Sequence, residues 1–325
     1  MKIEQLKING WNRQEESSLR VGKDGLIKED RVIKDNEIID IKDRRKNLTA
    51  QQRYFLNKSN EFKRHCDSLG GYIHMIYAKN EILFNKSEID KANISRIIYL
   101  ATYMDYNDRK EGLLCVRNQY SKLEPMDKKT MQSILKLTDS TFKRFLKDMK
   151  DNELIYEVDK KFYVNPIYFN RGDIDKDVKK SVDKSYCRLF IKPIRDLYEG
   201  CKTSKHKVLA SIYQLIPYIH YEHNIVCYNP NEVTDYPKAI TLRELCKMFE
   251  VDYKNSSKLA KSLYEFKVNV EGIDYHLFTY VILNAQYDYF VVNPLVIYGG
   301  NNYDNIIKTS KTLFFNKYTH RQKRK

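Results

Sequence analysis

The sequence predicts an α+β protein, mainly helical, that contains two tandem copies of one small domain. First, apolar residues recur at helical spacing in several segments, which alternate with short apolar runs typical of strands. Second, the same order of segments occurs twice in 325 residues, a length that suits about two domains. Third, both copies close on the tripeptide Val-Asn-Pro. The predicted fold class therefore rests on a repeated pattern of helices and short strands.

Residues 1–48 show little apolar periodicity, and Asp40–Asn47 is almost wholly polar. Such a composition buries too little apolar surface to offset the entropy cost of ordering the chain. We therefore expect a flexible N-terminal arm, extended or disordered when free. Order is expected to begin with a helix from its N-cap, Thr49, to about Cys66.

Residues 49–172 are predicted to form the first domain. After the helix at Thr49, the next expected elements are a β-hairpin of Tyr72–Tyr77 and Ile82–Phe84, a helix whose pattern starts at Ser87 and which ends near Tyr103, and a strand at Gly112–Val116. A helix capped by Asp127 follows, and then a third helix with Phe142, Phe145, Leu146 and Met149 on one face. The last expected elements are strands at Leu154–Val158 and Phe162–Val164. Helix, strand, helix, short turn, helix, hairpin is the order of a winged helix-turn-helix. In that motif the third helix enters the DNA major groove.

A polar linker at residues 173–184 is predicted to lead into a second domain at 185–302. Its expected elements are a helix through Val208, Leu209, Ile212, Leu215 and Ile216, a strand at Asn224–Tyr228, a helix capped by Thr241, a turn at Val251–Tyr253, a helix lined by Leu259, Leu263 and Phe266, and a longer wing of Val268–Val270 and Tyr275–Leu283. This order repeats that of the first domain.

An offset of 114 residues aligns the two copies through the helix-turn-helix, so that Asp127 falls on Thr241 and Met149 on Leu263. The closing Asn165 and Asn293 lie 128 residues apart, which makes the second wing 14 residues longer. Insertions at an exposed loop tip are tolerated. A period of this length indicates two copies of a domain, because solenoid repeats are much shorter.

Ile97–Asn107, Asp127–Lys150 and the closing Tyr163–Pro166 resemble proteins encoded by phages and plasmids of low-GC Gram-positive bacteria. Those proteins carry MarR-like winged helices, sometimes two in one chain, and the closing motif is also seen in winged-helix replication proteins. The resemblance covers residues 50–302 and implies binding to duplex DNA. Phe142 matches the aromatic residue expected early in the third helix, whereas Ser256 does not. The second copy is therefore expected to read DNA differently, or to pack rather than read.

DNA-contacting residues are expected on the exposed faces of the two third helices, at one wing tip and in the tail. In the first copy these are Ser140, Thr141, Lys143, Arg144 and Lys147, with Lys160 and Lys161 at the wing tip. In the second copy they are Lys254, Asn255, Ser257, Lys258 and Lys261, and in a basic C-terminal tail at 303–325 they are Arg321, Lys323 and Arg324. Arginine can bind a guanine edge, asparagine can bind adenine, and lysine reaches phosphates. The alternative for each set is a solvated surface.

A net charge of +15 favours a polyanionic partner, although a lysine-rich composition that only keeps a chain in solution is the alternative. No secretory signal and no run of about 18 apolar residues is present, so no membrane association is expected. The six cysteines never form a Cys-x-x-Cys pair, which is typical of reduced thiols in the cytoplasm.

Signatures of enzymes and cofactor sites are missing. The sequence has no phosphate-binding loop, no dinucleotide-binding motif and no nucleophile elbow, and His220 and His223 lack further metal ligands. We expect no enzyme, cofactor or metal. Because 26 tyrosines are present, a tyrosine-dependent DNA nicking or strand-transfer enzyme stays a less favoured alternative.

The predicted function is sequence-specific binding to double-stranded DNA, as a transcriptional regulator of a phage or mobile element. A replication initiator that binds origin repeats is the alternative. Expected partners besides DNA are a second copy of the chain and other replication or transcription proteins.

Overall fold

The computed structural model describes residues 18–21, 27–32, 48–76, 89–106, 112–172, 186–232, 234, 237–282, 288–300 and 302–315. The chain divides into two compact units, Met1–Asn57 and Lys58–Lys325. Helices combine with small antiparallel sheets, which confirms the predicted α+β class. Within the described ranges, no helix is both long and apolar enough to cross a membrane.

The first unit contains an antiparallel pair, β1 (Ser18–Val21) and β2 (Ile27–Val32), with an irregular register. These strands are extended segments, so they agree with the expected extended arm, and Leu19 and Val21 alternate with polar residues, as strands do. The flexibility of the arm stays a prediction. Helix α2 (Ala50–Ser68) begins where predicted. The Gln52 backbone N–H donates to Thr49 Oγ1 at 3.1 Å, and the Thr49 N–H donates to Gln52 Oε1 at 2.9 Å. This reciprocal capping confirms Thr49 as the N-cap.

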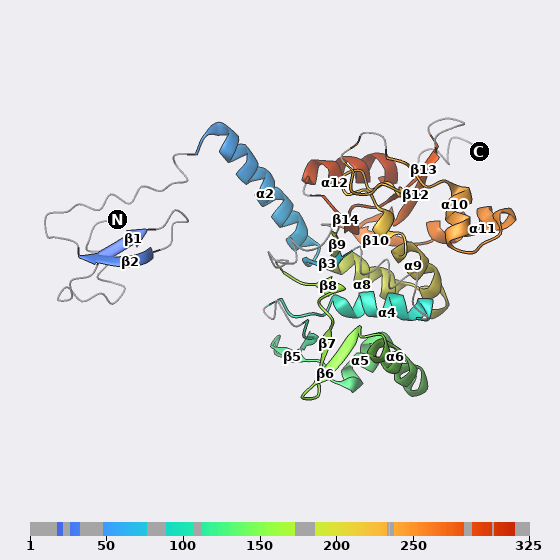
Figure 1. Cartoon of the computed structure of the whole chain (residues 1–325), viewed down its shortest axis with the longest axis horizontal. Helices are drawn as coiled ribbons and strands as arrows, with labels where there is room; N and C mark the ends of the chain where they lie inside the picture. The colour runs from blue at the N-terminus through green and yellow to red at the C-terminus, as the bar shows by residue number, and fades with distance from the viewer. Residues whose placement is uncertain are drawn as a thin grey trace. The chain divides into compact units, whose positions relative to one another are not determined.

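The second unit is organised around a four-stranded antiparallel sheet in the order β14–β9–β3–β8 (Figure 1). Its strands are β3 (Tyr72–Ile76), β8 (Phe169–Asn170), β9 (Tyr186–Phe190) and β14 (Ile297–Tyr298). The hairpin partner predicted at Ile82–Phe84 lies outside the described residues. The sheet neighbours of β3 are β9 and β8, which lie far along the chain.

Between β3 and β8 the first copy follows the predicted order, with one extra short strand. Its elements are α4 (Lys91–Ala101), β4 (Cys115–Arg117), β5 (Leu123–Pro125), α5 (Lys128–Leu135), α6 (Asp139–Asp151), β6 (Ile155–Val158) and β7 (Lys161–Val164). The Asp127 carboxylate accepts the Thr130 backbone N–H at 2.7 Å, which confirms the predicted cap of α5.

Between β9 and β14 the second copy has a related order, with an additional first helix and two further strands after its last helix. The strand predicted at Asn224–Tyr228 is present only as isolated β-bridges at Ile225, Val226 and Cys227. Its elements are α8 (Ile191–Gly200), the 3₁₀ turn η3 (Thr203–Lys205), α9 (His206–Tyr213), η4 (Ile216–Tyr218), α10 (Leu242–Met248), η5 (Tyr253–Asn255), α11 (Ser256–Tyr264), β10 (Lys267–Val270), β11 (Ile273–His276), β12 (Phe278–Ile282) and β13 (Asp288–Val292). Thr241 caps α10 through a capping box with Glu244, as predicted. Helix α8 was not predicted, although Ile191, Ile194 and Leu197 are buried at helical spacing.

Similar backbone hydrogen bonds occur at corresponding places in the two copies. The Leu114 N–H donates to Phe162 O at 2.8 Å, and the Val226 N–H donates to Phe290 O at 2.9 Å. The Asn of each Val-Asn-Pro motif closes its wing in the same way. Asn165 Nδ2 donates to Glu153 O at 2.9 Å, and Asn293 Nδ2 donates to His276 O at 3.0 Å. The shared motif is therefore a structural element that ties the end of the wing.

A glycine and an asparagine occupy equivalent left-handed positions before the first short strand of each copy. Gly112 has φ 73° and Asn224 has φ 54°. A Cβ at Gly112 would lie 2.1 Å from Val164 O, so that only glycine fits. Asn224 tolerates this backbone region, and its Nδ2 donates to Ile297 O at 2.6 Å. The two copies therefore adopt the same left-handed backbone conformation at this position with different residues.

The two copies join through equivalent strands. Strand β3 shifted by 114 residues becomes β9, and β8 shifted by 128 becomes β14. The β3–β9 register pairs Tyr72 with Phe190 and Ile76 with Tyr186, so each strand presents the same edge to the other. Helices α4 and α9, which are also equivalent, pack against each other. This arrangement is isologous, as in a dimer with twofold symmetry.

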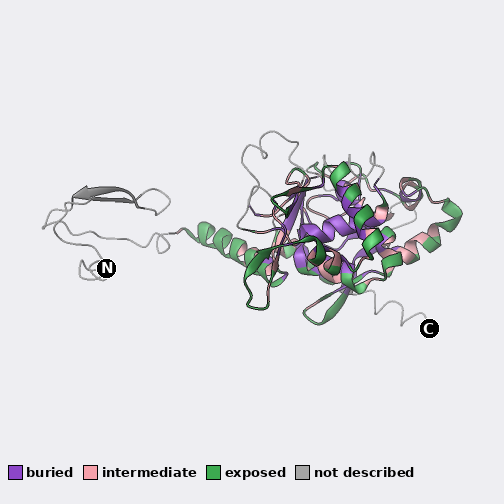
Figure 2. Ribbon diagram, turned by 90° about the horizontal axis from the view of Figure 1, so that it is seen from below, coloured by how far each residue is buried: buried purple, intermediate pink, exposed green. Residues whose placement is uncertain are grey.

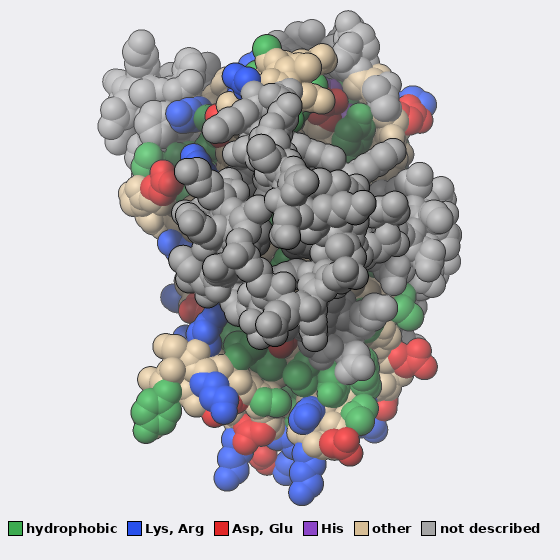
Figure 3. All heavy atoms as spheres, turned by 90° about the vertical axis from the view of Figure 1, so that its left-hand side faces the viewer, with side chains coloured by type: hydrophobic (Ala, Val, Ile, Leu, Met, Phe, Trp, Pro, Cys, Tyr) green, Lys and Arg blue, Asp and Glu red, His purple; other side chains and the backbone are tan. Residues whose placement is uncertain are grey.

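One apolar core runs through both copies. Figure 2 shows the buried residues gathered in the middle of this unit. In the view of Figure 3, acidic and basic side chains are interspersed among the described residues at the surface. The predicted linker at 173–184 lies outside the described residues, and the domain boundaries on either side of it stay a prediction. The two copies nevertheless share one sheet, because β3 of the first copy pairs with β9 of the second copy.

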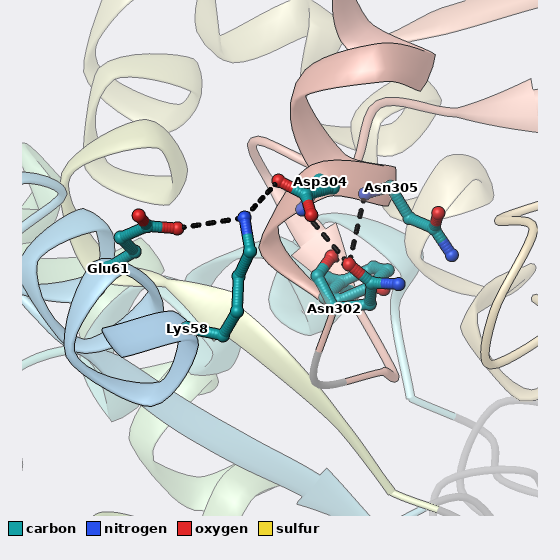
Figure 4. A network of polar contacts seen from close by, with 6 residues as sticks. Lys58, Glu61, Asn302, Asp304 and Asn305 are labelled. Carbon is teal, nitrogen blue, oxygen red and sulfur yellow. Dashed lines mark hydrogen bonds and ion pairs between the residues drawn. The ribbon is translucent and has the colours of Figure 1, made fainter. Parts of the chain in front are cut away.

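The C-terminal segment differs from its prediction. Residues 303–315 were expected to begin a basic tail, but they form α12 (Tyr303–Thr309) and a π-helical turn, η6 (Ser310–Phe315). Ile306 and Phe314 are buried in the core, which is why this stretch is helical. Lys58 Nζ of α2 lies 2.9 Å from Asp304 Oδ1 and 3.1 Å from Glu61 Oε2 (Figure 4). The ion pairs hold the start of α12 against α2.

Candidate nucleic-acid interface

Helix α6 separates a buried face from an exposed basic face. Phe142, Phe145, Leu146 and Met149 are buried, as predicted from their spacing. The opposite face carries Ser140, Lys143, Arg144 and Lys147, all exposed. Ser140 lies three and four residues before Lys143 and Arg144, which in turn lie four and three residues before Lys147, so the four side chains form one stripe along the helix. The structure therefore places four of the five helix residues predicted for the first copy on one exposed face.

The side chains of this stripe differ in how they are held. Lys143 Nζ lies 2.8 Å from Asp139 Oδ2, and this carboxylate raises the pKa of Lys143. An exposed pair of this kind contributes little, so a phosphate can replace the carboxylate. In the described part of the chain, the side chains of Arg144 and Lys147 have no ion-pair or hydrogen-bond partner. Thr141 is half-buried, and its hydroxyl is 2.9 Å from that of Thr138.

A polar contact fixes α6 on the rest of the molecule. Asn93 Nδ2 of α4 donates to Asp148 Oδ2 of α6 at 2.6 Å, and Arg96 donates to the Asn93 side-chain oxygen. Asn93 and Arg96 are both largely buried. A hydrogen-bonded polar group in a buried setting strongly prefers one geometry. The orientation of the basic stripe therefore depends on α4.

The wing of the first copy ends in an exposed basic tip. Asp159 and Lys160 have φ values of 50° and 61°, as expected for a two-residue type I′ turn. Lys160 and Lys161 are exposed there. Glu157 anchors the wing through Lys150 Nζ at 2.7 Å and Lys128 Nζ at 3.7 Å. Sequence reasoning missed this anchor because it joins three separate elements.

The second copy presents a similar stripe on a shorter helix. Lys258 and Lys261 of α11 are exposed at the positions equivalent to Arg144 and Lys147, and Ser257 is exposed beside them. Lys254 and Asn255 precede α11 in η5 and are also exposed. Lys254 Nζ lies 3.0 Å from Asp252 Oδ2.

The departure at Ser256 has a structural consequence. Ser256 is half-buried where Phe142 is buried, and the turn before it is 3₁₀ rather than α-helical. Without an aromatic anchor, the start of α11 is held less firmly by the core. The predicted tail residues Arg321, Lys323 and Arg324 lie outside the described residues.

The two basic stripes sit on equivalent helices on either side of the joint. Helix α6 packs on α4, α11 packs on α9, and α4 packs on α9 (Figure 1). The same symmetry that relates β3 to β9 therefore relates α6 to α11.

His220 and His223 have structural contacts. His220 is fully buried, and its Nδ1 accepts the backbone N–H of Glu222 at 3.3 Å and of His223 at 3.2 Å. Since Nδ1 accepts, Nε2 carries the proton and donates to Glu232 O at 2.9 Å. Both ring nitrogens are thus used to shape a turn. Across the described ranges, no group of three or more His, Cys, Asp or Glu residues is placed to hold a metal ion.

Comparison of the chain with protein-family models, with curated proteins and with solved structures found no match.

Proposed function

We propose that this chain binds double-stranded DNA in a sequence-dependent manner through two winged helix-turn-helix units, as a transcriptional regulator. One observation carries the proposal. Two exposed basic helix faces, on α6 and α11, are related by the pseudo-twofold symmetry of the β3–β9 joint.

The chemistry of each stripe suits a duplex. Arg144 projects from the middle of α6, where a guanidinium can donate two hydrogen bonds to a guanine edge in the major groove. Lys143 and Lys147, on either side of Arg144 in the chain, suit the flanking phosphates, as do Lys160 and Lys161 at the wing. Base contacts then set the preferred sequence, and phosphate contacts supply most of the affinity.

The symmetry of the joint predicts the symmetry of the DNA site. Two helices related by a twofold axis read half-sites in inverted orientation, about one helical turn apart. The second helix has Lys258 where the first has Arg144, so the two half-sites should differ in sequence. We expect an imperfect inverted repeat.

Selection from a pool of random duplexes with the full chain tests this. The expected result is enrichment of two unlike half-sites, inverted and about 10 base pairs apart from centre to centre. No enrichment over input would contradict sequence-specific binding. Enrichment of a single half-site, or of direct repeats, would contradict symmetric use of α6 and α11.

Mapping bound sites across the host genome then separates a regulator, bound beside promoters, from an initiator bound at an origin.

A further inference from the structure

A cavity of about 520 Å³ opens where the two copies meet, away from α6 and α11. The first copy supplies Arg117 and Arg171 to its lining, and α8 of the second copy supplies Lys192 and Arg195. Asp196 and Glu199 of α8 are the acidic residues among its lining residues. The lining thus contains four cationic side chains and two carboxylates. The cationic side chains come from both copies, and both carboxylates come from α8.

The three guanidinium groups are held by neutral acceptors. Arg195 Nε donates to Thr102 Oγ1 and its Nη2 donates to Thr102 O, both at 2.9 Å. Arg171 Nη1 donates to Met104 O, and Arg117 Nη1 donates to Ser121 O at 2.8 Å.

These acceptors fix the orientation of each guanidinium without neutralising it. Within the described ranges, no carboxylate lies within ion-pair distance of Arg117, Arg171 or Arg195. The guanidinium carbon of Arg195 also lies over the Tyr103 ring, 3.8 Å from its centroid. The three guanidinium groups at this cavity are therefore positioned, and none of them forms an ion pair with a described carboxylate.

A further observation supports an excess of positive charge. Burial lowers the pKa of Arg171, and the charges of Arg195 and Arg117 lower it further, while Asp105 partly offsets them. Glu199 Oε1 accepts the Tyr99 hydroxyl at 2.5 Å, which orients this carboxylate without removing its charge, so the four cations outnumber the two carboxylates of the lining. Like charges gathered in a partly buried site are costly unless an anion joins them.

We propose that this cavity binds a phosphate-bearing ligand the size of a nucleotide. A guanidinium fork matches the oxygens of a phosphate group, and two copies of the fork can bind two phosphates. The volume is in the range of small-molecule sites. Apolar side chains of Leu123 and Ile191 in the same lining suit the part of the ligand that carries no charge. Because the cations come from both copies, the ligand would bridge them.

Titration calorimetry on the full chain tests the proposal with ADP, inorganic pyrophosphate and adenosine. ADP and pyrophosphate should bind, and adenosine should bind at least about 10-fold more weakly because it has no phosphate. Arg117→Gln and Lys192→Gln should each weaken ADP binding about 10-fold, which is about 1.4 kcal/mol. Lys202→Gln is the matched control, an exposed lysine of the same copy outside the cavity lining, and should leave ADP affinity unchanged.

No binding of ADP or pyrophosphate at about 1 mM, where even a weak site of about −4 kcal/mol would be half filled, would overturn the proposal. So would equal affinity for ADP and adenosine, or unchanged affinity in both variants.

A short duplex of unrelated sequence distinguishes the source of the phosphate. If it displaces ADP, the ligand is the DNA backbone, and if ADP stays bound, the ligand is a free nucleotide. Since the cavity lies outside α6 and α11, this proposal and the proposed function can fail separately.

Discussion

His74 of β3 lies opposite Arg188 of β9, and these two residues occupy equivalent positions in the two copies. The pseudo-twofold axis therefore passes between them. The His74 ring contacts the equivalent pair Tyr72 and Tyr186, with ring centroids 5.0 Å away in both cases. Arg188 also lies over the Tyr72 ring, but in addition it donates to Gly300 O at 2.7 Å and lies over the Phe62 ring. Symmetry is thus kept in the backbone and broken in the side chains at the joint.

The shared sheet predicts that the two copies do not fold separately. Fragments 50–180 and 184–325 should each lack cooperative unfolding or should aggregate, because each exposes a strand edge and the apolar face of α4 or α9. Mixed in equal amounts, they should recover the helical circular dichroism of the intact chain. Two monomeric fragments with sharp thermal transitions would show that the joint is dispensable.

Arg144→Ala should weaken binding to the selected site by about 1–3 kcal/mol and relax one base position. The affinity for random duplex should fall much less, because specific base contacts do not form on DNA of unrelated sequence. Fluorescence anisotropy with both duplexes measures the two effects, and Arg64→Ala, an exposed arginine on α2, is the control. Equal losses on both duplexes would make Arg144 a phosphate contact.

The second stripe is tested through salt dependence. If Lys258 and Lys261 bind phosphates, the double alanine variant should reduce the slope of log K against log salt by about 1.8, because each phosphate contact contributes about 0.9. Lys63→Ala with Lys202→Ala, two exposed lysines outside α6 and α11, should leave the slope unchanged. An unchanged slope in the α11 variant would limit DNA contact to the first copy.

Phe314 is 3% exposed and should anchor the C-terminal segment. Phe314→Ala is expected to lower the free energy of unfolding by about 3–5 kcal/mol, the usual cost of emptying a buried aromatic site. Thr312→Ala, at an exposed neighbour, should change it by less than about 0.5 kcal/mol. Urea unfolding followed by circular dichroism compares them. A change of less than about 1 kcal/mol for Phe314→Ala would show that residues 303–315 are not anchored in the core.

Stability should fall under mildly acidic conditions. Burial lowers the pKa of His206 below its ordinary value of 6.5, so the unfolded chain binds a proton more readily than the folded chain. Stability is therefore fully present above about pH 6.5 and is lost as the pH falls toward the folded pKa. His206→Gln should reduce this pH dependence, by at most about 1.4 kcal/mol per pH unit. His65 and His220, whose pKa values burial also lowers, should supply the remainder. Identical pH profiles for both proteins would exclude His206 as a contributor.

The sequence by itself determined the features whose contacts are local. Asp127 and Thr241 cap helices by binding N–H groups three residues away, and the stripe of Phe142, Phe145 and Met149 follows from helical spacing. Such contacts depend on a few neighbouring residues, so their pattern can be seen in the chain. The repeat was visible for the same reason, because each copy carries the same local signals.

Only the tertiary structure decided which strands pair, how the copies join and where the C-terminal segment lies. Strand β3 pairs with β9, more than 100 residues away, and nothing near Tyr72 indicates that partner. The cluster of Arg117, Arg171 and Arg195 assembles from three distant segments. Pairings of this kind depend on the shape and apolar area that whole elements present to each other. That information is spread along the chain, and becomes local only when the core forms.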